Sequence, residues 1–383
     1  MNILYFIHSG GNASGGHFHS LDQVSKEVGK KHKTGIVSLG RNPSPVLSKN
    51  PFFLKHYFLN GEISRLFSLN QALRKTIKDF RPDVLHCFDT SSLNKILLMP
   101  ATFGIPIVLN KCGGPNPRRR NYQHANAMVV FSAENHEWFV NNPNYKKETI
   151  HLIPNRVEQL RFLPEQQRRE KKEKGKITFL RVTRIGGAYE KTLSDTFRMI
   201  EELKSSFPVK LIVVGKIQDK GRYLWFREQV KQRKLPVEFI TDERAGKGAD
   251  FLYLADFAIG TGRSFMEALS LGIPTLTPAK NADWPVLVNT QNFNSFFKTN
   301  FSERNQAPKE VLGTNKEKVI RLIEDREAFQ KAKAEAESLF RENFGTTQLF
   351  EKYDKVYQLT KNGNAGRPGL LLKNLPYILK SLI

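Results

Sequence analysis

The chain has 383 residues, and its 60 Lys and Arg exceed its 37 Asp and Glu to give a formal net charge of +23. This length suits two domains better than one, and a hydrophobic fraction of 39% excludes a disordered or fibrous chain. The charge predicts an anionic partner, which is nucleic acid, an anionic membrane surface or a phosphorylated substrate.

In the first half, short apolar runs alternate with helical patterns. Strands are predicted at Asn2–His8, Thr34–Leu39, Asp83–Phe88, Ile105–Leu109, Ala127–Phe131 and His151–Ile153. Helices are predicted at Phe18–Lys31, Leu66–Phe80 and Ser92–Phe103. Strands that alternate with helices favour a parallel sheet with helices on both faces.

The pattern breaks at Glu158–Lys176, and the part from Glu165 to Lys176 is almost wholly charged. This stretch reads as a solvated linker or surface helix, and the alternative is a patch that binds a membrane or nucleic acid. The alternation then restarts with strands at Ile177–Val182, Lys210–Val214, Val237–Ile240, Phe257–Ile259 and Pro274–Leu276. Helices are predicted at Ser194–Leu203, Tyr223–Gln232, Ser264–Leu271 and throughout the charged section Glu317–Leu359.

The two halves begin alike, with an apolar strand, a Gly-Gly loop and a helix. We therefore expect an α/β protein with two Rossmann-like doubly wound domains that face each other across a cleft. The predicted divisions are an N-terminal domain at 1–157, a charged linker at 158–175, a C-terminal domain at 176–345, and a C-terminal helix with a basic apolar tail at 346–383.

Several features indicate a cytoplasmic protein. The apolar run Asn2–His8 is too short for a signal peptide, and no apolar stretch approaches the roughly 20 residues that span a bilayer. The two cysteines, Cys87 and Cys112, exclude a disulfide framework and suit a reducing compartment. No Cys/His cluster has metal-ligand spacing, so neither a metal nor a cofactor is predicted.

Gly15 and Gly16 lie in a glycine-rich loop between the first strand and the first helix. Glycines let the backbone approach a ligand, and a helix N-terminus attracts negative charge. The spacing differs from a dinucleotide fingerprint, and a purely structural turn remains an equal alternative.

Arg184 and Lys191 directly follow the first strand of the second half. Ligands in open α/β sheets bind at the carboxyl ends of the strands, and two cations there suit a diphosphate. The alternative is that both are ordinary surface cations of a basic protein.

Glu267 lies in the early turns of a helix that follows the glycine loop Gly260-Thr-Gly-Arg263. Its carboxylate is placed to accept hydrogen bonds from vicinal ribose hydroxyls. The alternative is a glutamate that only interacts with the helix dipole.

Taken in order, these segments resemble the GT-B glycosyltransferases, in particular the retaining group called glycosyltransferase family 4. The likeness covers nearly the whole chain. Its most specific part is Glu267-Ala-Leu-Ser-Leu-Gly-Ile-Pro-Thr275. Other matching segments are Pro82-Asp-Val-Leu-His86, Phe131-Ser132 and Ile153-Pro-Asn-Arg-Val157.

The resemblance implies an N-terminal acceptor domain and a C-terminal domain that binds a nucleotide sugar. It implies that Arg184 and Lys191 stabilise the departing diphosphate, and that His86 or Asp89 positions the acceptor unless these are ordinary strand-end polar residues. It also implies a set of donor-binding residues: Gly15, Gly16, Asn155, Gly215, Gly262, Arg263 and Glu267.

Three positions depart from the family pattern. Ile259 stands eight residues before Glu267, where the family often has a first glutamate that touches the donor sugar. Phe88 and Cys112 stand where polar residues, often histidines, are frequent. The donor sugar and the acceptor therefore cannot be carried over from the family.

The resulting expectation is a retaining, metal-independent glycosyltransferase that uses a nucleotide-diphosphate sugar and a glycan or lipid-linked acceptor, in cell-surface polysaccharide or lipopolysaccharide synthesis. An alternative with the same fold is a nucleotide-sugar epimerase or a phosphorylase. Another is a basic nucleic-acid-binding protein, although the basic residues are dispersed, no binding motif is present, and nucleic acid is not the expected partner.

The C-terminal segment, residues 369–383, is apolar with interspersed lysines. It has two equal interpretations. It lies in the interface of an anionic membrane, which would make the protein peripheral at the inner membrane face, or it packs on the protein as C-terminal helices of this fold do.

Overall fold

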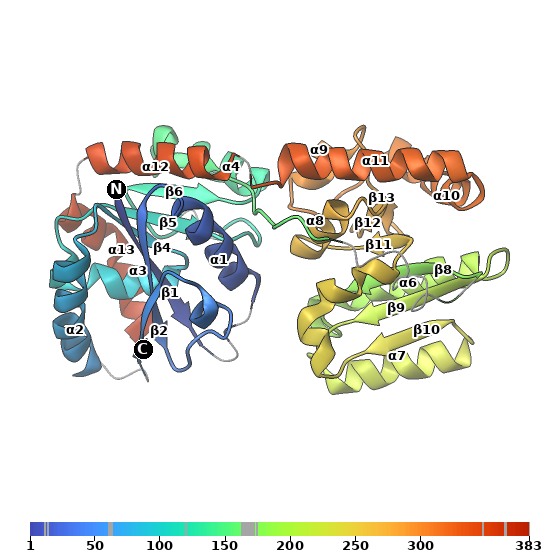
Figure 1. The fold of residues 1–383 in the computed structure, drawn as a ribbon, viewed down its shortest axis with the longest axis horizontal. Coiled ribbons are helices and arrows are strands. Elements are labelled where there is room, and N and C mark those ends of the chain that lie inside the picture. Colours follow the sequence, from blue (N-terminus) through green and yellow to red (C-terminus); the bar gives the residue numbers. More distant parts are fainter. Residues whose placement is uncertain are drawn as a thin grey trace. The chain divides into compact units, whose positions relative to one another are not determined.

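The computed structural model describes residues 1–10, 13, 15–59, 64–118, 121–161, 173, 175–346, 348–363 and 366–382. Contacts divide the chain into two compact units. Unit 1 consists of Met1–Arg156 and Thr346–Ile383, and unit 2 of Val157–Gly345 (Figure 1). Most of the stretch predicted as a charged linker falls outside the described residues.

The sheet of unit 1 is seven-stranded and parallel, in the order β3-β2-β1-β4-β5-β6-β7. Its strands are β1 (Asn2–Ser9), β2 (Lys33–Gly40), β3 (Phe53–Phe58), β4 (Val84–Cys87), β5 (Ile107–Lys111), β6 (Ala127–Val130) and β7 (Ile150–Leu152). The strand order reverses between β1 and β4, which is the topological switch point of a Rossmann-like sheet.

Helices cover both faces of this sheet because successive residues of the buried strands point to opposite sides. Tyr5 and Ile7 of β1 belong to the core that α1 (Gly16–Val28) and α12 (Leu349–Asn362) complete. Leu4 and Phe6 belong to the core on the opposite face. The helices that contribute to that second core are α2 (Ser64–Phe80), α3 (Thr90–Leu97), α4 (Ala133–Val140) and α13 (Arg367–Leu382).

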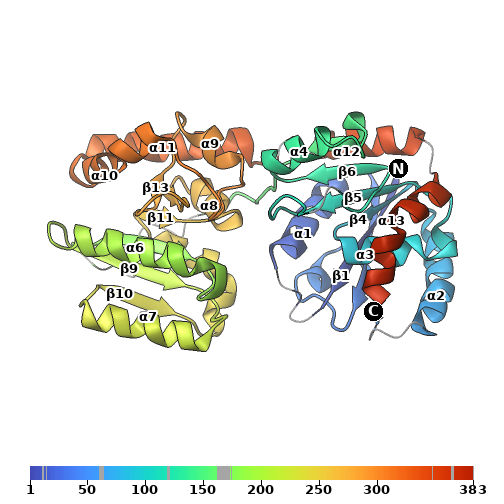
Figure 2. The same cartoon turned by 180° about the vertical axis from the view of Figure 1, so that it is seen from behind.

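Unit 2 repeats this plan with the order β10-β9-β8-β11-β12-β13, in which only β13 is antiparallel (Figures 1 and 2). Its strands are β8 (Ile177–Val182), β9 (Val209–Val214), β10 (Val237–Ile240), β11 (Phe257–Ile259), β12 (Thr275–Thr277) and β13 (Val286–Leu287). Its helices are α6 (Glu190–Leu203), α7 (Lys220–Gln232), α8 (Arg263–Ser270), α9 (Phe293–Phe297), α10 (Lys309–Glu324) and α11 (Arg326–Asn343). The predicted fold class, two doubly wound α/β units, is confirmed.

Some predicted elements differ from the observed ones. The helix predicted at Ser92–Phe103 ends at Leu97, and Pro100 begins a separate short 3-10 turn. The section Glu317–Leu359, predicted to be helical, is divided among three helices, α10, α11 and α12. The carboxylate of Asp325 accepts hydrogen bonds from the backbone N–H groups at the start of α11, so the chain stops and restarts there. Strand β3 and helix α4 were not among the predicted elements.

Among the described helices, none is both long and apolar enough to cross a bilayer.

Candidate functional site

The segments that carry Arg184, Lys191 and Glu267 follow β8 and β11. These two strands are neighbours where the strand order of the sheet reverses. Both are parallel, so their carboxyl ends meet at one edge, and a crevice at such a switch point is the usual ligand site of an open α/β sheet. The sequence of unit 2 therefore places Arg184, Lys191 and Glu267 around the same edge.

Arg184 is exposed on the turn that leaves β8. The turn is held by a parallel bridge between Ile185 and Ile217. Gly186 follows with φ of 106°, and a Cβ atom there would lie 2.7 Å from the Cβ of Asp219. This turn thus requires glycine two residues after Arg184. In the described part of the chain, the Arg184 guanidinium has no hydrogen-bond or ion-pair partner.

Lys191 lies in the first turn of α6, and its side chain is 54% exposed. Its Nζ is 2.7 Å from Oδ2 of Asp195 and donates a hydrogen bond of 3.0 Å to the carbonyl oxygen of Ala282. Burial raises the pKa of Asp195, and the neighbouring Lys191 opposes that rise. Ala282 belongs to the segment that follows β12, so Lys191 links α6 to the end of a third strand and still presents its ammonium group to solvent.

Glu267 is 9% exposed, and its Oε1 is 2.7 Å from Nε of Arg263, one turn earlier on α8. Burial raises the pKa of Glu267, while the charge and hydrogen bond of Arg263 lower it. The Nη1 of Arg263 is buried and has no hydrogen-bond partner among the described residues. Helix α8 begins after Gly262, whose φ of 48° and ψ of −116° suit glycine alone.

Asn300 is a neighbour of this loop that the sequence did not indicate. Asn300 and Phe301 both have left-handed backbone conformations, with φ of 58° and 53°. The N–H of Gly262 donates to the carbonyl oxygen of Phe301, and the Phe301 ring stacks on Phe265 with centroids 3.9 Å apart. The Oδ1 of Asn300 is buried without a partner in the described structure. Strained backbone and unsatisfied polar atoms cluster at functional sites, so Asn300 joins the candidate site.

Gly215, predicted to contact the donor, has a packing role. A Cβ atom at this position would lie 1.5 Å from the carbonyl oxygen of Thr183, so the end of β9 approaches the end of β8 closely. Unit 1 has the same arrangement, since a Cβ at Gly40 would lie 2.0 Å from the carbonyl oxygen of Ser9. Only glycine permits this approach.

In unit 1, the structure brings Gly15, Gly16 and Asn155 together at the start of α1. Gly15 precedes the helix, and Gly16 has open space where a side chain would be. The hydroxyl of Ser20 donates to Oδ1 of Asn155 at 2.7 Å and to the carbonyl oxygen of Gly16 at 2.9 Å. Backbone N–H groups at this helix start are suited to an anionic group.

His86 lies inside unit 1 and is 0% exposed. Its Nδ1 is 2.9 Å from the hydroxyl of Tyr357, and its Nε2 is 3.2 Å from Oδ1 of Asn110. Burial lowers the pKa of His86 to about 3, so the ring is neutral, and it donates to Asn110 while Tyr357 donates to it. Of the two interpretations left open by the sequence, this geometry favours a structural polar residue over an acceptor contact.

Asp89 has a similar local explanation. It is the N-cap of α3, and its two carboxylate oxygens accept from the backbone N–H groups of Ser92 at 2.7 Å and His8 at 2.6 Å. These bonds fasten the end of β1 to the start of α3. A capping role therefore accounts for this aspartate within unit 1.

Within the residues that the structure describes, no group of three or more His, Cys, Asp or Glu side chains is placed to hold a metal ion.

No protein-family model matches the chain, and no curated protein matches it either. Solved structures do resemble it. HepE of Anabaena in complex with UDP superposes with a TM-score of 0.68 at 14% identity, and the match covers 94% of this chain and 100% of that one. HepE has also been crystallised with UDP-glucose. A glycosyltransferase of Rickettsia africae superposes with a TM-score of 0.71 at 14% identity, and the match covers 94% of this chain and 99% of that one.

A Listeria monocytogenes chain with a provisional designation as a UDP-N-acetylglucosamine 2-epimerase gives a TM-score of 0.58 at 13% identity, with coverage of 94% and 96%. At these identities the likeness concerns the fold. The GT-B fold predicted from the sequence is confirmed, and the assignment to family 4 stays a prediction.

Proposed function

We propose that this chain is a glycosyltransferase that moves a sugar from a nucleotide-diphosphate sugar to a glycan or a lipid-linked acceptor. The observation that carries the proposal is the grouping of Arg184, Lys191, Arg263 and Glu267 around the switch point of the unit 2 sheet. Three cations and one buried carboxylate suit a ligand with a diphosphate and a ribose. HepE, which shares the fold, was crystallised with UDP and UDP-glucose.

In the proposed reaction, the bond between the anomeric carbon and the diphosphate oxygen breaks, and a bond from that carbon to an acceptor hydroxyl oxygen forms. The hydroxyl proton leaves with the nucleoside diphosphate. Negative charge grows on the departing diphosphate, and fixed cations at Arg184 and Lys191 stabilise it electrostatically. With this charge supplied by the side chains, the reaction proceeds without a metal, and the new bond keeps the anomeric configuration.

Glu267 accepts hydrogen bonds from the ribose hydroxyls, and the unpaired Nη1 of Arg263 contacts a phosphate oxygen. In unit 1, the start of α1 beside Gly15, Gly16 and Asn155 binds an anionic group through backbone N–H groups. Cell-surface polysaccharide or lipopolysaccharide synthesis at the cytoplasmic face of a membrane is the setting that we propose, because the basic charge of the chain suits anionic acceptors.

The test is transfer and hydrolysis of a panel of labelled nucleotide-diphosphate sugars by the full chain. Lys191→Ala and Glu267→Ala are expected to lose at least about 100-fold in activity, as removal of a charge-stabilising group does, with an unchanged far-UV circular dichroism spectrum. Glu327→Ala, which removes a glutamate from an exposed i,i+4 ion pair on α11, is the control.

Turnover like that of the wild type in either site variant would overturn the assignment. Conversion of a UDP-sugar to its epimer in the absence of any acceptor would favour the epimerase alternative instead.

A further inference from the structure

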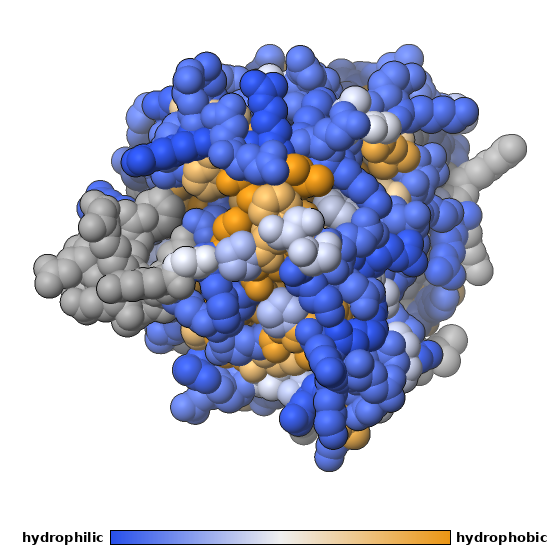
Figure 3. All heavy atoms as spheres, turned by 90° about the vertical axis from the view of Figure 1, so that its right-hand side faces the viewer, coloured by the Kyte–Doolittle hydropathy of each residue, from blue (hydrophilic) through white to orange (hydrophobic). Residues whose placement is uncertain are grey.

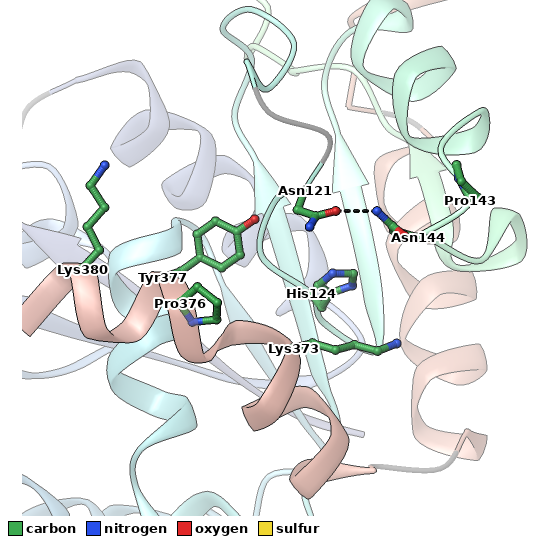
Figure 4. Close-up of a pocket in the computed structure, with 8 residues that line it drawn as sticks. All are labelled: Asn121, His124, Pro143, Asn144, Lys373, Pro376, Tyr377 and Lys380. Carbon is green, nitrogen blue, oxygen red and sulfur yellow. Dashed lines mark hydrogen bonds between the residues drawn. The ribbon is translucent and has the colours of Figure 1, made fainter.

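A cavity of about 730 Å³ lies in unit 1 beneath the C-terminal helix α13 (Figure 4). Its walls come from three places in the chain. They include Asn121 and His124 before β6, Asn144 before β7, and a row of side chains on α13. None of the described residues that line it is acidic.

The cavity is separate from the sites described above. Residues 121–124 and 143–144 precede β6 and β7, so they lie toward the amino ends of these parallel strands. The expected ligand site of this sheet is at the carboxyl ends. Neither donor binding nor the proposed chemistry therefore uses this cavity.

Specific contacts hold its walls in place. The Asn374 side chain accepts from the His124 N–H and donates to the His124 carbonyl oxygen, both at 2.9 Å. The His124 ring stacks on Tyr145 with centroids 4.5 Å apart and an interplanar angle of 11°. Asn144 donates to Asn121 across the opening, as Figure 4 shows. The cavity is thus part of the folded unit and does not depend on one loose side chain.

The cavity is positively charged. Lys373 and Lys380 line it from two turns of α13, and neither forms an ion pair within the described chain. Burial and the nearby Lys373 lower the pKa of His124 to about 4, so at neutral pH its ring is uncharged and offers one N–H donor. Ammonium groups and neutral donors without an acid nearby are suited to phosphate oxygens.

A hollow on unit 2 provides a contrast. It measures about 340 Å³ and lies between α10 and α11, where lysines at 318 and 331 face acids at 325, 327 and 335. Figure 3 views the molecule from the side of α10, and apolar residues gather there within a largely hydrophilic surface. Because the unit 2 hollow contains both lysines and acids, its charges give no preference for an anion.

Helix α13 has three distinct faces. Asn374 and Ile378 are buried against unit 1. Lys373, Tyr377 and Lys380 face the cavity. A third face carries three exposed leucines, which are Leu372 at 72%, Leu375 at 43% and Leu379 at 53% exposure.

At about 100° per residue, these leucines fall within an arc of about 60°, and the two lysines lie about 120° from its centre. An exposed leucine stripe beside a basic face is the pattern of a helix that lies in a membrane interface. The segment Arg367–Leu382 also contains no Asp or Glu, so no carboxylate on the helix opposes an anionic surface.

We propose that the α13 cavity binds the headgroup phosphate of an anionic membrane lipid while Leu372, Leu375 and Leu379 enter the bilayer interface. Charge complementarity selects an anionic surface, and the leucine stripe selects a lipid over a nucleic acid, which has no apolar face for it to contact. The proposal rests on the proposed function, in which a lipid-linked acceptor is reached at a membrane surface. Lipid binding itself can be measured without catalysis.

The experiment is co-sedimentation of the full chain with phosphatidylcholine vesicles that contain or lack phosphatidylglycerol. We expect binding only to the anionic vesicles. Lys373→Ala/Lys380→Ala should weaken it about 10- to 30-fold, because each lysine near an anionic surface contributes about fivefold. Leu372→Ala/Leu375→Ala/Leu379→Ala should also weaken it, and Lys318→Ala/Lys331→Ala in the unit 2 hollow is the charge-matched control.

Vesicle binding that the lysine and leucine variants leave unchanged would overturn the proposal. Inorganic phosphate and glycerol 3-phosphate form a second arm, read by thermal shift. If these small phosphates raised the melting temperature only when Lys373 and Lys380 were present, and no vesicles were bound, the cavity would be a site for a free phosphate. That result would overturn the proposal of a lipid headgroup. A gel shift of duplex DNA that these lysines control, again without vesicle binding, would overturn it as well.

Hydrolysis of the nucleotide sugar, measured without vesicles, separates this proposal from the previous one. The lysine variant should keep that activity, and loss of membrane binding with intact hydrolysis supports the lipid site independently of the acceptor.

Discussion

Arg263 and Glu267 stand one turn apart on α8 and form an ion pair, with Nε 2.7 Å from Oε1. The proposed function gives the first a phosphate contact and the second a ribose contact. Their contact indicates that each holds the other in place, because burial disfavours an unpaired charge on Glu267 and Arg263 supplies the opposite one. The donor pocket of unit 2 is therefore partly organised before a ligand enters.

Glu267→Gln tests this pair. The amide carries no charge to pair with the guanidinium of Arg263, so Arg263 loses its orientation and the ribose loses a charged acceptor. We expect UDP affinity to fall at least about tenfold, equivalent to about 1.4 kcal/mol, in isothermal titration calorimetry. Glu327→Gln, in the exposed pair with Lys331, should leave the affinity unchanged. Equal affinities for all three proteins would contradict the ribose role.

Lys191 and Asp195 form a second coupled pair. Lys191→Ala leaves the buried Asp195 without its cation and should lower the free energy of unfolding by about 1–3 kcal/mol. Lys191→Ala/Asp195→Asn removes the unpaired charge and should recover most of that loss in urea titrations. Donor turnover should stay absent in both variants. Recovery of activity together with stability would show that Lys191 acts only on the fold.

Gly215→Ala is expected to destabilise unit 2 by about 1–3 kcal/mol or more, since the added methyl group would meet the carbonyl oxygen of Thr183 at 1.5 Å. Thermal unfolding measures the effect. Gly246→Ala is the matched control, because a Cβ there meets nothing within 4 Å and the substitution restricts the unfolded chain. If both variants melted alike, the close approach of β9 to β8 would not matter for stability.

His86 contributes to the acid sensitivity of unit 1. Its pKa is about 3 in the folded chain and near 6.5 when unfolded, so between these values the unfolded state binds more protons. The contribution is fully present above pH 6.5 and is lost as the pH falls toward 3, with a slope of up to about 1.4 kcal/mol per pH unit.

His86→Gln keeps a polar side chain but cannot titrate, so its unfolding free energy should depend less on pH in this window. Several other histidines also have lowered pKa values, so the relevant quantity is the difference between the variant and wild-type curves. Parallel curves from pH 6.5 to 4 would contradict the assignment.

The sequence predicted the α/β class and most strands because buried parallel strands are continuous apolar runs bounded by glycine and proline. Strand β3 was not predicted because Lys55 and His56 interrupt its apolar pattern. Glu267 could be identified because its motif is continuous in sequence, from the middle of α8 to the start of β12. Asn300 was not, since nothing in its spacing reveals a left-handed backbone conformation beside Gly262.

Burial set a second limit on the sequence-based predictions. His86 and Asp89 lie near the carboxyl end of β4, where ligand contacts are common. Their hydrogen-bond partners could not be predicted from the spacing of residues in the sequence. Tyr357, which holds His86, is 271 positions away in the chain. For the C-terminal segment, the sequence left membrane contact and packing as alternatives, and α13 has one buried face and one exposed leucine face.

Helix α12 places Tyr353 and Tyr357 in the core that also contains Tyr5, and the Tyr5 and Tyr357 hydroxyls are 2.9 Å apart. The core around Tyr5 is thus completed only by a helix that is synthesised 352 residues later. During synthesis, the α1 side of unit 1 stays uncovered while all of unit 2 emerges and has time to fold. A nascent chain released before α12 is made would expose that apolar surface to solvent.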